Sequence, residues 1–129
     1  MQRIPTLVGI SGHFKDEIFR LQYGTTSVVG RSRDADFSLK RTKIYRAQST
    51  EQRDADESAQ TVSAKHFEVT MFNLRSIEVK NLSPNGIVVD GRSAQVAAFD
   101  DVNTRTHEIR FGTEEVLRLE MREYEEGSE

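Results

Sequence analysis

Short segments rich in β-branched and aromatic residues recur along this chain, and each is followed by Gly, Asn, Asp or Ser. Several of them alternate apolar and polar side chains, which is typical of strands with one buried face. No stretch of ten residues shows a convincing period of 3.6, so long amphipathic helices are not expected. We therefore predict an all-β fold, a two-sheet β-sandwich. The predicted strands are 7–10, 17–21, 27–29, 36–39, 66–71, 76–80, 87–89, 108–111 and 116–121.

The alternation of side chains also predicts the hydrophobic core. In a strand with one solvated face, the apolar alternate points inward. Aromatic residues at this spacing are far more often core residues than a base-stacking surface. The run 96–99 is predicted to form a helical turn. The residues predicted to be buried are Phe67, Val69, Met71, Ile77, Val79, Ile109, Phe111, Leu117 and Leu119.

The 129 residues are predicted to form one domain over 1–122, followed by an acidic tail at 123–129. A domain of this size buries enough surface to fold without covalent cross-links. The apolar pattern lapses over 40–62, which is a long interruption for a compact domain. We therefore expect a long, polar and mobile insertion loop before Ser63.

Composition excludes several classes of function. The chain has no cysteine, so it has no disulfide, thiolate zinc site or cysteine nucleophile, and it suits a reducing compartment. No apolar run is long enough to span a bilayer, and 1–5 lacks the features of a secretion signal. The net charge of −3 provides no global positive field for nucleic acid or an acidic membrane surface. We expect a cytoplasmic protein with neither kind of partner.

Three short polar motifs stand where predicted strands meet loops. They are Gly30-Arg31, the sequence Ser-Ala-Lys-His at 63–66, and the sequence Asn-Leu-Ser-Pro-Asn-Gly at 81–86. Loops at the end of a β-sandwich commonly carry the ligand-binding side chains. The motifs therefore predict a binding-loop cluster.

The side chains of these motifs are mainly hydrogen-bond donors. Arg31 offers a planar fork of N–H groups, while Ser63 and Lys65 add a hydroxyl and an ammonium. Asn85 carries both a donor and an acceptor, which suits the main chain of a bound peptide. Such a set fits an anion with several acceptor oxygens, and phosphate attached to a peptide is the natural candidate.

The three histidines indicate neither a metal site nor a cofactor. His66 is interpreted as a neutral imidazole that ties neighbouring loops together, because no second histidine lies at ligand spacing. His13 and His107 are interpreted as isolated loop residues.

Taken together and in order, the motifs resemble the signature of the forkhead-associated (FHA) domain, which is Gly-Arg, then Ser-x-x-His, then Asn-Gly. The resemblance extends from about the first predicted strand through Met121. It implies a twisted sandwich of about eleven strands, with binding loops at one end and both termini at the other. Members of this family recognise phosphothreonine in an extended peptide, prefer it to phosphoserine, and act as adaptors without catalysing a reaction.

The resemblance also implies a role for each motif residue. Arg31 and Ser63 would contact the phosphate, Asn85 would bond the peptide main chain, and Lys65 would be an additional cation. The partner would be a protein that carries phosphothreonine, and an upstream Ser/Thr kinase is implied. The residues that would shape the loops are Gly30, His66 and Gly86.

Two features depart from the family pattern. Family members often carry a hydroxyl residue directly before the asparagine, whereas this chain has Pro84, which cannot donate a hydrogen bond. The long loop can also fold over the site, obstruct it, or bring Arg41, Lys43 or Arg46 to the phosphate. The sequence leaves these possibilities open.

Three other hypotheses remain beside the phosphothreonine adaptor. One is a phosphorylation-independent interaction or scaffold domain on the same fold. Another is an enzyme with Asp34, Asp36 and His66 as an acid–base set, which is disfavoured because no nucleophile accompanies these residues and carboxylates repel phosphate. The third is self-association after phosphorylation of a threonine in or beside the long loop. The candidate threonines are Thr42, Thr50 and Thr61.

Overall fold

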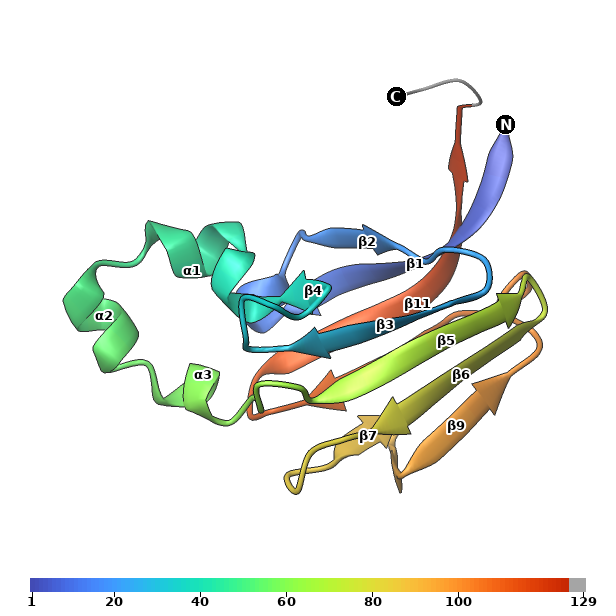
Figure 1. The fold of residues 1–129 in the computed structure, drawn as a ribbon. Coiled ribbons are helices and arrows are strands. Elements are labelled where there is room, and N and C mark those ends of the chain that lie inside the picture. Colours follow the sequence, from blue (N-terminus) through green and yellow to red (C-terminus); the bar gives the residue numbers. More distant parts are fainter. Residues whose placement is uncertain (126–129) are drawn as a thin grey trace.

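A computed structural model describes residues 1–125 of the chain and shows two stacked β-sheets (Figure 1). One sheet has six strands in the order β2-β1-β11-β10-β7-β8, and the other has five in the order β4-β3-β5-β6-β9. Every predicted strand is present, and the predicted two-sheet sandwich is confirmed. The strands are β1 (Gln2–Ser11), β2 (Ile18–Arg20), β3 (Thr25–Gly30), β4 (Phe37–Ser38), β5 (Phe67–Asn73), β6 (Ser76–Asn81), β7 (Ile87–Val89), β8 (Arg92–Ala94), β9 (Val96–Phe99), β10 (His107–Phe111) and β11 (Glu115–Tyr124).

The hydrophobic core lies between the two sheets. All residues whose burial was predicted from alternation are buried. An aromatic group crosses the core: Phe111 contacts Phe67 at 5.0 Å and Phe14 at 5.7 Å between ring centroids, and Phe14 contacts Phe37 at 4.8 Å. Such edge and tilted contacts between buried rings stabilise the packing of the two sheets.

The run at 96–99 is a strand, so the prediction of a helical turn there was wrong. Val79 pairs with Ala97 and Ile77 with Phe99, which makes this run the edge strand β9 beside β6. The short strand β8 before it belongs to the other sheet. Strand pairing therefore outweighs the weak local preference of this alanine-rich run.

The range 40–62, predicted to be a loop, contains three short helices. They follow a 3₁₀ turn at Leu39–Arg41, and we call the whole range 40–62 the insertion. A polar side chain caps the start of each helix: Thr42, Ser49 and Asp56 accept hydrogen bonds from backbone N–H groups one turn on. The helices are α1 (Lys43–Ala47), α2 (Thr50–Asp54) and α3 (Glu57–Gln60).

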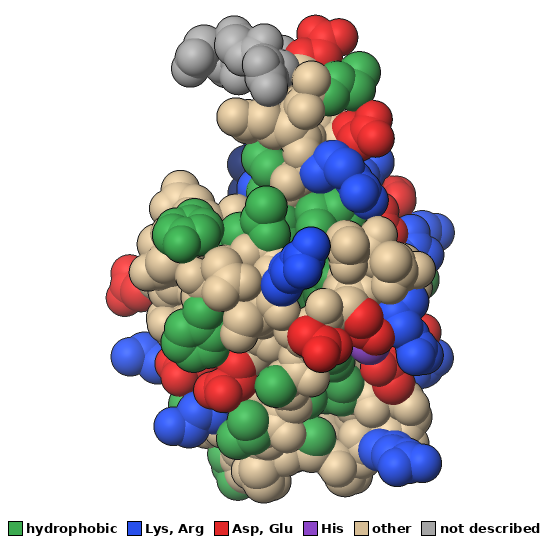
Figure 2. All heavy atoms as spheres, turned by 90° about the vertical axis from the view of Figure 1, so that its right-hand side faces the viewer, with side chains coloured by type: hydrophobic (Ala, Val, Ile, Leu, Met, Phe, Trp, Pro, Cys, Tyr) green, Lys and Arg blue, Asp and Glu red, His purple; other side chains and the backbone are tan. Residues whose placement is uncertain are grey.

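The two ends of the sandwich differ. The insertion and the β6–β7 turn lie at one end, whereas the start of β1 and the end of β11 project from the other as a two-stranded arm (Figure 1). β11 continues to Tyr124, two residues into the range predicted as a tail, and 126–129 lie outside the described residues. Figure 2 views the arm end and shows acidic, basic and hydrophobic side chains interspersed over it. Among residues 1–125, no helix is long and apolar enough to cross a membrane.

Candidate functional site

The three polar motifs meet at one end of three neighbouring strands of the five-stranded sheet. β3, β5 and β6 are neighbours in that sheet and pair antiparallel, with Val29 opposite Phe67 and Phe67 opposite Asn81. The end of β3, the start of β5 and the end of β6 therefore lie side by side. Strand order brings together residues that are more than 50 positions apart in the chain.

The backbone of the first motif packs directly against the second. The Arg31 N–H donates to the Ser63 carbonyl at 2.9 Å, and the Ser32 N–H donates to the Ala64 carbonyl at 3.2 Å. A Cβ atom on Gly30 would lie only 2.2 Å from the Ala64 carbonyl oxygen. Glycine at position 30 is therefore required for this close approach of the two loops.

A pair of serine hydroxyls links the second and third motifs. The Oγ atoms of Ser63 and Ser83 lie 2.6 Å apart, and Ser83 Oγ accepts a hydrogen bond from the Asn85 N–H at 3.0 Å. Asn81 fixes this turn, because its side chain bonds both the N–H and the carbonyl of Ser83. Position 84, directly before Asn85, is a proline, and the nearest hydroxyl in the turn is that of Ser83, one residue earlier. Ser83 was not selected from the sequence.

His66 lies fully buried beneath these loops and connects them. Its Nδ1 accepts from the Ser63 N–H at 3.0 Å, and its Nε2 donates to the Gly86 carbonyl at 2.8 Å. Burial lowers the pKa of His66, so the ring is neutral at physiological pH. Gly86 adopts φ +76°, a conformation that glycine tolerates best. The ring of Phe111 supports the imidazole from below at 5.3 Å.

The insertion reaches the same cluster through two consecutive residues. Arg31 Nη1 donates to the Gln60 backbone oxygen at 3.3 Å and to Gln60 Oε1 at 3.2 Å. Asn85 Nδ2 donates to the Thr61 carbonyl at 3.0 Å. Lys65 is exposed and has no hydrogen-bond or ion-pair partner within residues 1–125. Gln60 carries no motif signal and was not selected from the sequence, and Thr61 was selected only as a candidate for phosphorylation.

Within residues 1–125, the basic side chains of the insertion form no hydrogen bond or ion pair with this cluster. Arg41 instead donates to the carbonyls of Ala35 and Asp36. The acid–base set imagined from the sequence is also divided: Asp36 accepts from the Val28 N–H at 2.7 Å, whereas His66 is bound to backbone groups of the loops.

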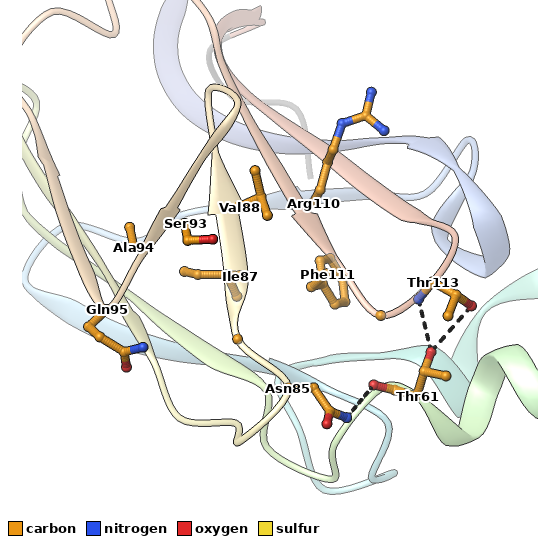
Figure 3. Close-up of a pocket in the computed structure, with 12 residues that line it drawn as sticks. Thr61, Asn85, Ile87, Val88, Ser93, Ala94, Gln95, Arg110, Phe111 and Thr113 are labelled. Atoms are coloured by element: carbon orange, nitrogen blue, oxygen red, sulfur yellow. Dashed lines mark hydrogen bonds between the residues drawn. The ribbon is translucent and has the colours of Figure 1, made fainter.

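A groove of about 520 Å³ begins beside Asn85 (Figure 3). It runs along β7, β8 and β10, and its lining combines apolar residues such as Ile87, Val88 and Phe111 with polar ones. Gln95 lies across the groove from Asn85 in Figure 3, while the Arg110 side chain extends away and bonds Glu108 at 2.7 Å. The groove is therefore a channel of mixed polar and apolar lining next to the polar cluster.

His13 is buried and binds two carboxylates, so its interpretation as an isolated loop residue was wrong. Nδ1 lies 2.7 Å from Glu115 and Nε2 lies 2.6 Å from Asp56. The hydrogen bond to Glu115, together with the one to Asp56, raises the pKa of His13 to about 9 against the effect of burial. Because Asp56 caps α3, the charged ring fastens the insertion to the sandwich.

His107 is likewise not an isolated loop residue. It begins β10, lies 6% exposed, and contacts Asp90 at 2.6 Å and Asp101 at 2.7 Å. Its ring stacks on Phe99. Burial raises the pKa of Asp90, but the hydrogen bond with His107 and others outweigh it, so the net shift is downward. No group of three or more His, Asp or Glu side chains within the described range is arranged to hold a metal ion.

The three candidate threonines differ in accessibility. Thr42 is 1% exposed, and its hydroxyl both caps α1 and donates to the Leu39 carbonyl. The Thr61 hydroxyl donates to the Ser58 carbonyl and accepts from the Thr113 N–H. Thr50 is exposed at the start of α2. Of the three, Thr50 is the one that a modifying enzyme can reach most readily.

No family model matches the chain, and neither does any curated protein. Solved structures do resemble it. The FHA domain of the CT664 protein from Chlamydia trachomatis is 24% identical, with a TM-score of 0.62 over 96% of this chain and 100% of that one. The FHA domain of an Arabidopsis thaliana hypothetical protein is 15% identical, with a TM-score of 0.67 over 98% and 92% of the two chains.

A third structure contains a ligand. Mycobacterium tuberculosis EmbR, solved in complex with a low-affinity phosphopeptide, is 18% identical, with a TM-score of 0.64 over 98% of this chain and 27% of that one. At these identities the likeness is one of fold. It confirms the fold that the order of the sequence motifs predicted.

Proposed function

We propose that this chain, which has the fold of FHA domains, is a phosphopeptide-binding module that recognises phosphothreonine in a partner protein. The observation that carries the proposal is that the loops of Arg31 and Ser63 lie against each other at one end of the sheet, joined by a backbone hydrogen bond. The Lys65 ammonium lies on the same loop as Ser63. These groups are donors of positive or neutral charge, and an oxyanion is the ligand that such a set favours. The solved complex of EmbR with a phosphopeptide supports the proposal by analogy of fold.

Each side chain has a distinct proposed role. The guanidinium of Arg31 and the hydroxyl of Ser63 bind phosphate oxygens, and Lys65 adds positive charge from an exposed position. Asn85 uses its side-chain oxygen to accept from the peptide main chain, while its amide nitrogen stays on Thr61. The residues that shape the loops around them are Gly30, His66 and Gly86.

The groove beside Asn85 is the proposed path of the peptide away from the phosphate. Its mixed polar and apolar lining can contact both the main chain and the side chains that flank the phosphothreonine. Phosphate contacts position a ligand, whereas such flanking contacts decide between different phosphorylated sequences. We therefore expect the sequence preference to depend on the groove and the affinity to depend on Arg31.

Calorimetric titration of a phosphothreonine peptide library, and of the same library without phosphate, tests the proposal. Loss of two charge-assisted hydrogen bonds should weaken binding by about 100-fold or more in Arg31→Ala. Arg33→Ala is the matched control, because Arg33 is an exposed arginine two positions away. Equal affinity for phosphorylated and unphosphorylated peptides would overturn the phosphate role.

A phosphorylation-independent interaction domain is the second candidate. The contacts of Arg31 and Asn85 with the insertion favour it, because both side chains already have partners without any ligand. The two candidates differ in one outcome. A partner that is retained by the variant Arg31→Ala/Ser63→Ala supports the second candidate and excludes the first.

The remaining details are part of the proposal. The module is proposed to act as an adaptor and not as an enzyme, in the cytoplasm, downstream of a Ser/Thr kinase. We assign the self-association after phosphorylation to Thr50, because Thr50 is the exposed one of the three candidate threonines. Treatment with a Ser/Thr kinase followed by mass spectrometry and sizing tests this, with Thr50→Ala as the variant. An unchanged oligomeric state after modification of Thr50 rules out the self-association.

A further inference from the structure

We propose that Gln60, at the end of α3 in the insertion, is a positioning residue that presents Arg31 to phosphate. The inference rests on the proposed function, and it gives the insertion a part in the binding site. In this role the insertion supports phosphate binding and does not act as a lid that blocks the site.

The contact between Gln60 and Arg31 uses only one corner of the guanidinium. Both acceptors, the backbone oxygen and Oε1 of Gln60, are reached by Nη1, which carries two hydrogens. Within residues 1–125, the Nε and Nη2 atoms of Arg31 have no partner. These two nitrogens form the side-on fork that holds two phosphate oxygens at once. Gln60 thus occupies the corner that phosphate does not need.

The position of Gln60 is fixed on both sides along the chain. Before it, Asp56 is bonded to the buried His13 and caps α3. After it, the Thr61 hydroxyl accepts from the Thr113 N–H at 3.0 Å, and the Thr61 carbonyl accepts from Asn85. Because these contacts hold the backbone of α3, Arg31 is oriented before any ligand arrives, which reduces the entropy that binding costs.

The character of the contact favours orientation over competition. Both acceptors on Gln60 are neutral, and the hydrogen bonds to Oε1 at 3.2 Å and to the backbone oxygen at 3.3 Å are longer than the usual N–H···O distance. A phosphate dianion binds a guanidinium more strongly than a neutral amide does. An acidic residue at this position would compete with phosphate, and glutamine does not.

The test is an NMR titration with N-acetyl-phosphothreonine N-methylamide, which probes the phosphate site alone. Gln60→Met keeps the length of the side chain and removes its Oε1 acceptor, so Arg31 retains only the hydrogen bond to the backbone oxygen, and binding should weaken by about 3- to 10-fold. Gln22→Met is the matched control, because Gln22 is an exposed glutamine in the loop before β3. Gln60→Glu should weaken binding more than Gln60→Met, since the carboxylate pairs with Arg31 and repels phosphate.

A second readout separates positioning from a structural role. The ¹H–¹⁵N heteronuclear NOE of the Arg31 Nε–H group should fall in Gln60→Met and stay unchanged in Gln22→Met, while both variants melt at the wild-type temperature. Unchanged or tighter binding by Gln60→Met overturns the inference.

The two failures can be told apart. If the wild type binds the probe, Arg31→Ala does not, and Gln60→Met binds like the wild type, only the role of Gln60 is wrong. If the wild type and Arg31→Ala both fail to bind any phosphothreonine probe, the proposed function is wrong, and the role of Gln60 is refuted with it.

Discussion

His66 and His13 play similar structural roles in two regions of the molecule, but His66 is neutral and His13 is positively charged. Each is a buried ring that joins segments far apart in the chain. His66 joins the binding loops and bonds only backbone groups, and burial lowers its pKa. His13 joins the insertion to the sandwich and bonds two carboxylates, chiefly Glu115, which raise its pKa to about 9.

The difference has a consequence for the candidate site. A neutral ring beneath the loops adds no charge and uses no side-chain donor, so Arg31 and Lys65 remain available to an anion. The charged ring beneath the insertion is paired with two carboxylates, and its removal would leave their buried charge without a cation. The binding loops and their support are therefore expected to respond differently to mutation and to pH.

The largest effect is expected from His13→Leu. This change leaves Asp56 and Glu115 buried without their cationic partner, and should lower the free energy of unfolding by about 3–5 kcal/mol. Urea denaturation measures it. Asp56→Asn is the control, because asparagine still caps a helix and one carboxylate remains for His13, so the loss should be smaller. A loss below about 1 kcal/mol for His13→Leu would show that the ion pairs do not anchor the insertion.

The pH dependence of stability should show the same anchor in the wild type. Because the pKa of His13 is raised from 6.5 in the unfolded chain to about 9, its contribution is complete below pH 6.5 and is lost between pH 6.5 and 9. The loss amounts to about 3 kcal/mol. Urea denaturation at several pH values measures it, and His13→Leu should flatten this part of the curve. A wild-type curve that is level from pH 6.5 to 9 contradicts the assignment.

The strands could be predicted because they depend on local patterns, whereas the meeting of the motifs depends on strand order and was predicted from the resemblance to the FHA signature. Alternation places Phe67 and Val69 on one face, and turn residues mark where the strands end. The partners of His13 lie 43 and 102 positions away, so no local pattern indicates them. The contacts of Gln60 depend on how the insertion folds back, which composition does not determine.

Some missed features did leave a signal in the sequence. Ser49 and Gln52 form a capping box, and that spacing is a known start of a helix. It was hidden because α2 is too short to show a helical period. Ser83 likewise lies in the same turn as Asn85. It was not predicted because the family pattern places the hydroxyl directly before the asparagine, and Ser83 lies one residue earlier.

His66→Leu should have the next largest effect, and it should fall on the binding loops. The Ser63 N–H and the Gly86 carbonyl lose their partners, which should cost about 2–3 kcal/mol. Phosphopeptide affinity should fall as well, because the loops lose their shared support. In contrast to His13→Leu, this variant should keep the decline in stability between pH 6.5 and 9.

The lowered pKa of His66 also predicts how the stability of the protein changes at acidic pH. Its pKa is lower in the folded protein than in the unfolded chain, so the unfolded state binds the proton more strongly below pH 6.5. Wild-type stability should therefore fall as pH falls below 6.5, and His66→Leu should show a shallower fall. Identical slopes in the two proteins would mean that His66 is not buried as a neutral ring.

The smallest effect is expected from Thr61→Val, which removes a contact between the insertion and Thr113 and leaves the contacts of His13 and His66 intact. The Thr113 N–H loses its acceptor, so the free energy of unfolding should fall by about 1 kcal/mol. Thr113→Val is the matched control, because it keeps that N–H and removes only a hydroxyl contact at 3.5 Å. The pH profile of Thr61→Val should run parallel to that of the wild type, since the charge of His13 is unaffected. Equal losses in the two valine variants would instead assign the effect to the contact between the two hydroxyls, and the Thr113 N–H would then contribute nothing to the attachment of the insertion.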